Sequence, residues 1–388
     1  METCAHKSRL LDRESLLAFT IYFGLSLFFF GRGLIGHFGD RYIGVGPDPS
    51  AHLYFLAWWP YAVRHRLNPF ITRYVWFPSG VNLTHSTSIV LPALLFAPLT
   101  LLFGPTPAYT LIMLLSPAFS ALAAFILYKR ISSCSLPAFT GGFIYGFSPF
   151  ELGHMLGQPS LVASWFAPLI VYFASRRLDG GISSKTLFWI LTLLLIGQAG
   201  FSLETLATTT LIGGLALIVW SAFADVHLRY KILTLLYPLA GAYAVMVAVF
   251  SPYFYYFFHG PQLSLPSQLA AYLSVDPLNF LIPTETNELG FFLRNWLAPH
   301  ANLYEATAHV GLPAILIVAM TVWRQWRSPV VRLCAWILAI TAVLAIGPFL
   351  EVSRRLIVPA PELLLFLWAP FFKNAMPCRF TEFIFFCR

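Results

Sequence analysis

Charged residues are scarce in this chain. Of its 388 residues only 10% are Asp, Glu, Lys or Arg, whereas 58% are hydrophobic and 17% aromatic. A soluble domain carries about 25% charged and roughly 45–50% apolar residues. A water-soluble globule, a disordered chain and a coiled coil are therefore excluded, because the polar atoms that would cover their surfaces are missing. The composition predicts an all-α polytopic membrane protein that forms a single unit over residues 1–388.

Motifs of soluble catalysis are also missing. The chain has no GxSxG nucleophile motif, no P-loop, and no GxGxxG site with the following acid that binds a nucleotide ribose. Its five cysteines form no CxxC pair, which predicts free thiols rather than a disulfide framework. A serine hydrolase and an enzyme with a soluble nucleotide donor are disfavoured. The activated substrate of an enzyme would then come through the membrane.

Long apolar runs give the expected spans, since a helix needs about 20 apolar residues to cross the hydrocarbon core. We expect spans at 16–36, 107–128, 136–150, 160–175, 186–200, 203–223, 232–257, 305–323 and 330–350, with a tenth run beginning near Arg379. The chain stops inside that tenth run, so we expect a protein truncated at its C-terminus. The runs 88–103 and 356–371 are short and broken by prolines. We expect 88–103 to be an interfacial helix and leave open whether 356–371 spans.

The distribution of Lys and Arg orients these spans. With nine spanning runs, one side of the membrane receives 13 of the 24 basic residues and five of the 16 acidic ones. The whole formal charge of +8 then falls on that side. Loops rich in Lys and Arg face the cytoplasm, which predicts an integral membrane protein with a cytoplasmic N-terminus. Because topology explains the charge, no basic patch remains that would indicate a nucleic-acid partner.

Two long segments, residues 37–106 and 258–304, are expected on the outer side. Loops of this length in a compact protein are usually functional. Their aromatic residues suit the headgroup layer of the lipids, and residues 50–66 predict an amphipathic helix on the outer membrane surface.

Outer carboxylates are the candidate reactive groups. Asp40 and Asp48 lie in the first outer loop, Glu151 and His154 follow the third run, and Glu204 lies between the fifth and sixth runs. Ionisable groups at span ends must face water, a cavity or a partner. Acids that converge from separate spans would line a cleft that opens outward.

Each candidate also has a structural interpretation. Asp48 before Pro49 fits a helix N-cap, and Glu151 after Pro149 fits a residue that caps or orients a loop. Glu204 fits a buried, paired carboxylate. Glu305 and His309 stand four residues apart, but two residues do not make a metal site.

The order of motifs adds a resemblance. A first span is followed by an outer loop whose acid precedes an aromatic helix (PDPSAHLYFLAWWPYAV). The interfacial run that ends in LFG is preceded by the motif PSGVN. Further along, an acid and a Gly-His pair follow the motif GGFIYGFSPF. The last apolar run is preceded by MPCRF, which has the pattern P-x-R-F. This order resembles the GT-C superfamily of integral-membrane glycosyltransferases, which includes the protein O-mannosyltransferases, the aminoarabinose transferases and oligosaccharyltransferase. The likeness covers most of the chain, is strongest over 37–160, and favours bacterial members and hence the plasma membrane.

The resemblance implies an outer-loop acid that faces a lipid-linked sugar, with Asp48 in that position and Asp40 as the second candidate. The donor would be a sugar on a polyprenyl phosphate, and the acceptor a glycan, lipid or protein. One carboxylate would take the proton of the acceptor hydroxyl during an inverting displacement, with Glu151 as a third candidate. Arginine would stabilise the phosphate, and the P-x-R-F pattern favours Arg379.

Further substrate-binding residues are expected to be His154, Glu204, Arg294 and Glu305. Some relatives in this superfamily carry an acidic pair in the first outer loop, and the resemblance therefore allows a divalent cation. Here the two acids are eight residues apart, so no metal ligands are predicted.

Two other functions stay open beside the transferase, which is the leading hypothesis. A transporter or flippase of lipid-linked sugars should show repeats, or acids and broken helices at mid-membrane depth; the sequence shows no repeat and its acids gather on one side. A non-catalytic assembly subunit of a cell-envelope glycan system would keep the fold and lose the acid.

Overall fold

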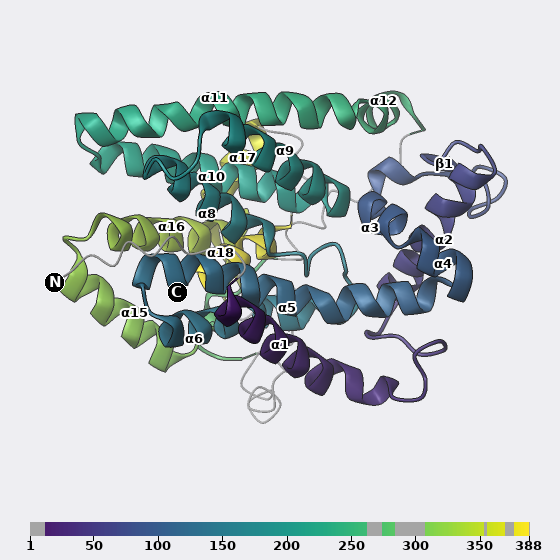
Figure 1. Cartoon of the computed structure of the whole chain (residues 1–388), viewed down its shortest axis with the longest axis horizontal. Coiled ribbons are helices and arrows are strands. Elements are labelled where there is room, and N and C mark those ends of the chain that lie inside the picture. The colour runs from purple at the N-terminus through teal and green to yellow at the C-terminus, as the bar shows by residue number, and fades with distance from the viewer. Residues whose placement is uncertain (1–11, 262–273, 284–306, 353–354, 369–375, 388) are drawn as a thin grey trace.

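The computed structural model describes residues 12–261, 274–283, 307–352, 355–368 and 376–387. Long helices lie side by side, and a group of shorter elements covers one end of the bundle (Figure 1). The all-α expectation holds except for two small antiparallel sheets. One pairs β1 (Ile71–Thr72) with β2 (Val81–Asn82), and the other pairs β3 (Phe349–Val352) with β4 (Arg355–Pro359).

Five helices are long and apolar enough to cross a membrane, so the chain is a helical membrane protein. The first, α1 (Arg13–Ser26), continues through a π-helical turn (Leu27–Gly31) and a 3-10 turn (Arg32–Leu34). The others are α5 (Pro105–Ser132), α9 (Ser184–Phe201), α10 (Leu203–Phe223) and α11 (Val226–Val249). All five coincide with predicted apolar runs.

The remaining predicted spans correspond to shorter helices. These are α6 (Ser135–Gly146), α8 (Phe166–Leu178), α15 (Leu312–Gln325) and α16 (Pro329–Ala345). A helix of 12 residues is about 18 Å long, compared with about 30 Å of hydrocarbon. The total of nine or ten spans therefore stays a prediction.

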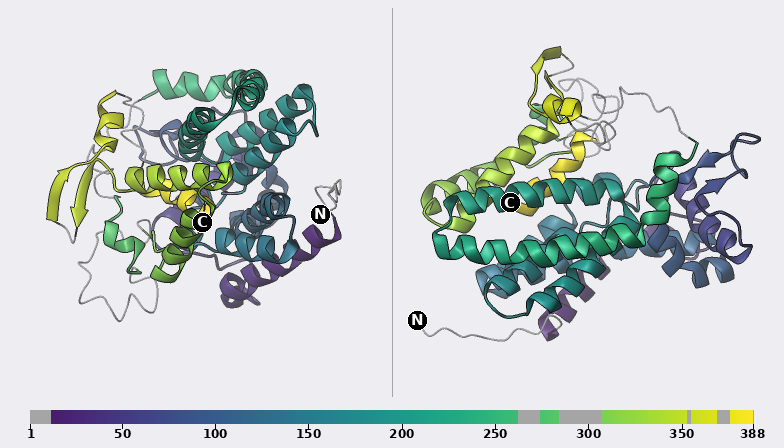
Figure 2. Two further views of the ribbon diagram at one scale, coloured as in Figure 1. Left: turned by 90° about the vertical axis from the view of Figure 1, so that its left-hand side faces the viewer. Right: turned by 90° about the horizontal axis from the view of Figure 1, so that it is seen from above.

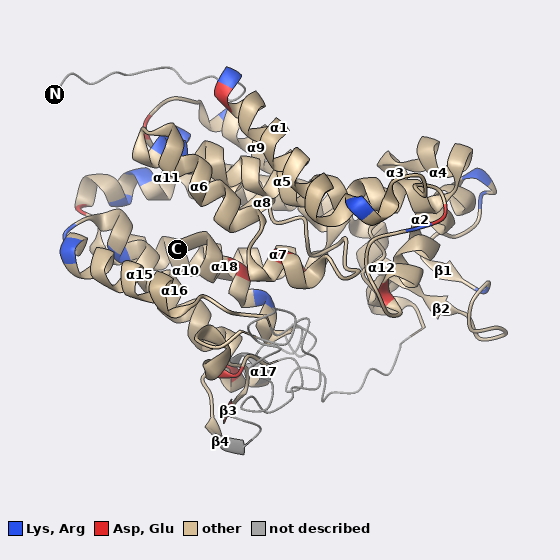
Figure 3. Ribbon diagram, turned by 90° about the horizontal axis from the view of Figure 1, so that it is seen from below, with Lys and Arg blue, Asp and Glu red and all other residues tan. Residues whose placement is uncertain are grey.

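Basic residues gather at one end of the bundle (Figure 3). They stand where α1 and α11 begin, where α5 and α8 end, and at the turn between α15 and α16. Ion pairs connect neighbouring helix ends there: Lys129 Nζ lies 2.6 Å from Asp12 Oδ2, and Arg130 pairs with Asp179. The loops that the sequence assigns to one side of the membrane thus share one end of the structure.

The first outer segment forms the opposite end (Figure 1). It contains α2 (Asp48–Arg64), the β1–β2 hairpin, a 3-10 turn (Leu83–His85), α3 (Val90–Leu95) and α4 (Ala97–Phe103), and it packs beside α12 (Ser251–His259). At six and seven residues, α3 and α4 are too short to span, as expected for residues 88–103.

Helix α2 packs one side against the rest of the protein, and its place on the membrane surface stays a prediction. Trp58 and Trp59 are buried, and their indole N–H groups donate to the carbonyls of Pro69 and Ser88 at 2.9 and 3.1 Å. These bonded acceptors let both indoles enter the core at no hydrogen-bonding cost. Trp76 and Phe77, in the hairpin, are by contrast exposed.

The largely buried helix α5 supports α6 through very close contact. A Cβ added at Gly142 would lie 2.6 Å from the Ala121 carbonyl oxygen, and one at Gly146 would lie 2.5 Å from that of Pro117. This contact positions α7 (Pro149–His154), which follows α6 directly. Residues 155–165 are then non-helical and mostly buried, so the predicted span at 160–175 begins only at Phe166.

The C-terminal part returns into the core (Figure 2). After β3 and β4 come α17 (Glu362–Trp368), a 3-10 turn (Pro377–Phe380) and α18 (Thr381–Cys387), and residues 377–385 are buried. Of the predicted run 356–371, the described residues 356–368 are part strand and part short helix. Of the second predicted outer segment, only 258–261 and 274–283 are described; they include the end of α12 and a 3-10 turn (Pro277–Phe280).

We expect Glu362, the first residue of α17, to make stability depend on pH. Its carboxyl is 2% exposed, and burial raises its pKa to about 8 from an ordinary 4.5. Above pH 4.5 the folded protein keeps a proton that the unfolded chain releases, so stability falls as the pH rises toward 8, by about 1.4 kcal/mol per pH unit. Thermal unfolding of wild type and Glu362→Gln at pH 5 to 9 measures this. The variant should lose that part of the slope, and identical slopes would contradict the assignment.

Candidate functional site

Asp48 begins α2 and is held by a residue from a distant loop. Gln158 Nε2 donates to Asp48 Oδ2 at 3.0 Å. Pro47 occupies the N-cap position and no side chain caps the helix, so the N-cap interpretation of Asp48 is wrong. Its carboxyl is half-buried and is oriented toward the loop after α7 rather than toward its own helix.

Asp40, the second candidate, has different surroundings. Its side chain is 70% exposed and lies 3.3 Å from His37 Nδ1. The structure therefore gives the two loop acids separate partners. Among the described residues, no three His, Cys, Asp or Glu side chains gather as metal ligands would.

Close backbone packing fixes Asp48 beside residues 155–158. The Val45 N–H donates to the Leu156 carbonyl at 2.8 Å. Gly44 has φ +109°, and a Cβ there would lie 2.5 Å from that same carbonyl oxygen. Gly157 has φ +150°, and its Cβ would lie 2.6 Å from Pro49 Cδ. Only glycine fits these two positions without a shift of the backbone.

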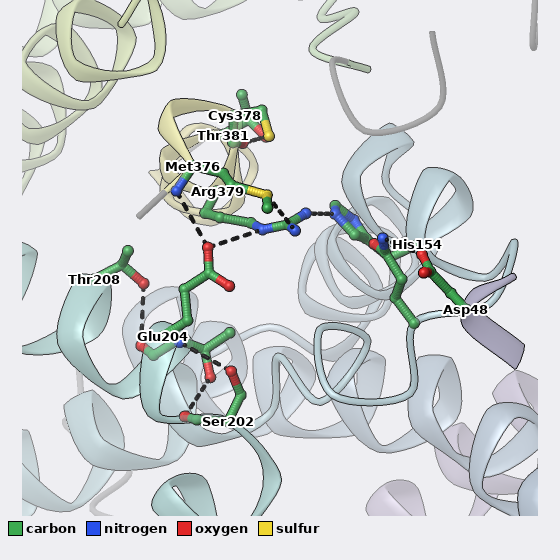
Figure 4. A network of polar contacts seen from close by, with 11 residues as sticks. Asp48, His154, Ser202, Glu204, Thr208, Met376, Cys378, Arg379 and Thr381 are labelled. Atoms are coloured by element: carbon green, nitrogen blue, oxygen red, sulfur yellow. Dashed lines mark hydrogen bonds and ion pairs between the residues drawn. The ribbon is translucent and has the colours of Figure 1, made fainter. Parts of the chain in front are cut away.

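Arg379 connects three parts of the chain (Figure 4). It lies in the 3-10 turn Pro377–Phe380 and is 3% exposed. Its Nη1 donates to His154 Nε2 at 2.5 Å, and its Nε donates to Glu204 Oε1 at 3.3 Å. Glu204 also accepts from the Met376 N–H at 3.2 Å. The predicted pairing of Glu204 is confirmed, but the prediction that it is buried is wrong, because its side chain is 20% exposed.

His154 accepts from Arg379 as a neutral imidazole. Its Nδ1 donates to the Phe150 carbonyl at 2.6 Å, so Nε2 carries the lone pair. Burial, together with the Arg379 charge, lowers the pKa of His154 well below its ordinary range. The Gln158 N–H donates to the His154 carbonyl at 2.9 Å. A series of contacts, running in part through the backbone of Gln158 and His154, therefore links Asp48 to Arg379; we call it the polar path.

Glu151 lies one helical turn before His154 on α7 and is 1% exposed. Ser148 caps α7 instead, accepting from the Glu151 N–H at 3.4 Å, so a capping role for the Glu151 side chain is wrong. Neither carboxyl oxygen has a hydrogen-bond partner. Burial raises the pKa of Glu151 well above its ordinary value.

Two of the polar residues in the core, Gln158 and Glu382, were not predicted from the sequence. No sequence pattern indicated a role for Gln158, because glutamine is common in loops. Glu382 could have been recognised, because it is an acid inside the last apolar run. A charge in such a run is energetically unfavourable and is usually functional. Two expected site residues, Arg294 and Glu305, lie outside the described residues.

Fold and site together define a helical membrane protein with a buried arginine–carboxylate centre near loops at one end. A family model described as Domain of unknown function (DUF6311) matches residues 19–372. The chain belongs to this family. No curated protein and no solved structure matches it.

The glycine contact beside Asp48 predicts a steric effect. In Gly157→Ala the new methyl group would meet Pro49, and the residue would keep an unfavourable φ, so we expect a loss of about 1–3 kcal/mol in unfolding free energy. Thermal unfolding measures it. Gly213→Ala in α10 is the matched control, because a Cβ there meets nothing within 4 Å. Equal stability of the two variants would contradict the close packing.

The Arg379 centre predicts an electrostatic effect. Glu204→Gln removes a carboxylate that pairs with the buried guanidinium, and breaking a buried pair in this way costs about 3 kcal/mol. We expect a clear fall in melting temperature. Asp40→Asn breaks an exposed pair and should change little. A Glu204 variant as stable as the Asp40 variant would show that the ion pair contributes nothing.

Proposed function

We propose that this protein is a membrane glycosyltransferase of the GT-C type. It would move a sugar from a polyprenyl-phosphate donor to a glycan, lipid or protein acceptor. The observation that carries the proposal is the polar path. It links a half-buried carboxylate in the loop after the first span, Asp48, to an arginine in the P-x-R-F segment, Arg379.

Asp48 has the environment of a general base. Gln158 binds one carboxylate oxygen, and the partly exposed side chain can meet an acceptor hydroxyl. Asp48 would take the hydroxyl proton as that oxygen attacks the anomeric carbon. The bond from this carbon to the phosphate oxygen breaks, and the electron pair leaves with the polyprenyl phosphate. A single displacement of this kind inverts the anomeric configuration.

Arg379 is suited to the phosphate. Its Nη2 donates to Met376 Sδ at 3.0 Å, and a thioether is a weak acceptor. A phosphate oxygen would form a much stronger, charge-assisted bond in its place. Because His154 is neutral and accepts from Arg379 through Nε2, it orients the guanidinium without adding a second positive charge.

The charge distribution supports transfer on the outer face. Most of the described Lys and Arg lie at the end of the bundle opposite to α2, which Asp48 begins, and fewer lie beside α2 itself (Figure 3). By the positive-inside rule the Asp48 end faces outward. We therefore place the N-terminus in the cytoplasm, with the shorter apolar helices completing nine or ten spans in a bacterial plasma membrane. No step in this mechanism uses a divalent cation.

A transporter or flippase is the second candidate. Glu151 and Glu382 are buried carboxyls beside the non-helical segment 155–165. Broken helices with buried acids are typical of ion-coupled transporters.

Sugar transfer in proteoliposomes tests the proposal. Polyprenyl-phosphate sugars carrying a labelled sugar are supplied, and release of label from the lipid is followed. We expect Asp48→Asn to lower the rate about 100- to 10,000-fold, the contribution of a general base. Asp40→Asn is the matched control and should retain activity, because its carboxyl is exposed and separately paired.

The other outcomes discriminate between the candidates. Equal rates for wild type and Asp48→Asn would move the base to Asp40 or Glu151. If well-folded wild type releases no label, the transferase hypothesis is rejected, and the transporter or the assembly subunit is favoured instead.

A further inference from the structure

A second polar cluster lies in the core, separate from Asp48. It contains Glu151 on α7, Glu382 on α18 and Tyr145 on α6, which are 1%, 4% and 1% exposed. Tyr145 Oη lies 2.8 Å from the Ser164 carbonyl and 3.2 Å from Glu382 Oε1, and its hydroxyl donates to these acceptors. Both oxygens of Glu151 are buried without a hydrogen-bond partner. A buried carboxylate in this state requires an explanation.

The groups around Glu151 present oxygen atoms. The hydroxyls of Ser164 and Ser120 are close enough to favour its charged form. Each hydroxyl also approaches a backbone carbonyl at the long end of hydrogen-bonding distance: Ser120 Oγ lies 3.4 Å from the Val162 carbonyl oxygen, and Ser164 Oγ lies 3.5 Å from that of Leu161. The hydroxyl lone pairs remain for another partner.

The local charge is unbalanced. Arg379 is paired with Glu204, and none of the described basic side chains forms an ion pair with Glu151 or Glu382. The two acids also repel each other. An isolated ionised carboxylate in an apolar core is very unfavourable. A positive species must therefore accompany Glu151 when it is ionised.

The backbone near this acid is unwound and mostly buried. Residues 155–165 form no helix. At membrane depth such backbone is tolerated only where it is buried in protein or lines a cavity, and the carbonyls of unwound segments bind Na⁺ in transporters. Leu161, Val162 and Ser164 offer carbonyl oxygens within this segment.

We propose that Glu151 binds a sodium ion, together with the hydroxyls of Ser120 and Ser164 and carbonyl oxygens of residues 161–164. All these ligands are hard oxygen atoms. The set holds one carboxylate, and Glu382 is occupied by Tyr145, so the ligand charge matches a monovalent ion. None of these ligands belongs to the path that links Asp48 to Arg379, so sodium binding can be tested apart from the role of Asp48.

Sodium-dependent thermal unfolding of the full chain tests this site. The protein is reconstituted in nanodiscs at pH 8, and NaCl replaces choline chloride at constant ionic strength while tryptophan fluorescence is followed. We expect a saturable rise in melting temperature on the order of 2–5 °C. The same salt series with KCl and CaCl₂ should give a smaller shift. Binding of radioactive Na⁺ should saturate over the same concentration range.

Glu151→Gln should lose both the shift and the binding. Glu362→Gln, which neutralises another buried carboxyl on α17, is the matched control and should keep them. If Glu151→Gln does not fold, Ser164→Ala removes one ligand and should raise the sodium concentration at half-saturation several-fold.

Three results would overturn the proposal. The first is a wild type with no Na⁺-specific shift at pH 8, which would make a proton the partner of Glu151. The second is a sodium response that survives in Glu151→Gln, and the third is a larger response to Ca²⁺ than to Na⁺. Each result is read without an activity assay, so it is distinguishable from a failure to transfer sugar.

Discussion

The close approach of α6 to α5 is the contact on which the rest of the structure depends. Gly142 and Gly146 bring the α6 backbone against the carbonyls of α5, where any side chain would collide. In a bilayer, such small-residue contacts replace the hydrophobic driving force that lipid cannot provide between helices. Because α7 follows α6 directly, this contact also fixes the positions of Glu151 and His154. The two polar clusters of the core, one around Glu151 and one around His154, therefore depend on glycine at positions 142 and 146.

The two polar features balance charge differently. Around His154 a guanidinium meets a carboxylate, and the neutral imidazole adds no charge, so the centre is balanced within the protein. Around Glu151 only oxygen atoms gather. The centre around His154 therefore needs no bound ion to balance its charge, whereas Glu151 requires a cation or a proton. Glu151 and His154 lie one turn apart on α7, so this one short helix contributes a residue to each cluster.

Much of the fold could be predicted from hydropathy, because spanning helices must satisfy their backbone within apolar segments. Glu204 was also recognisable as a paired acid, since an ionised group at a span end needs a partner. The partner itself, Arg379, lies 175 residues away, and only tertiary structure brings the two together. The helix at 160–175 was predicted too early because residues 160–165 are mostly apolar, and hydropathy does not show that they form turns. Burial of Trp58 likewise depended on a carbonyl acceptor in the following loop.

The distance in sequence between Glu204 and Arg379 has a consequence for biosynthesis. The chain is made from the N-terminus at about 5–20 residues per second. Roughly 10–35 seconds then pass between the appearance of the acid and that of its arginine. During this interval α10 has already been made, with an uncompensated carboxyl at its first turn. The insertion machinery, or a proton, must shield that carboxyl until the later segment arrives. Assembly of the centre is therefore a late event that follows insertion of the helices around it.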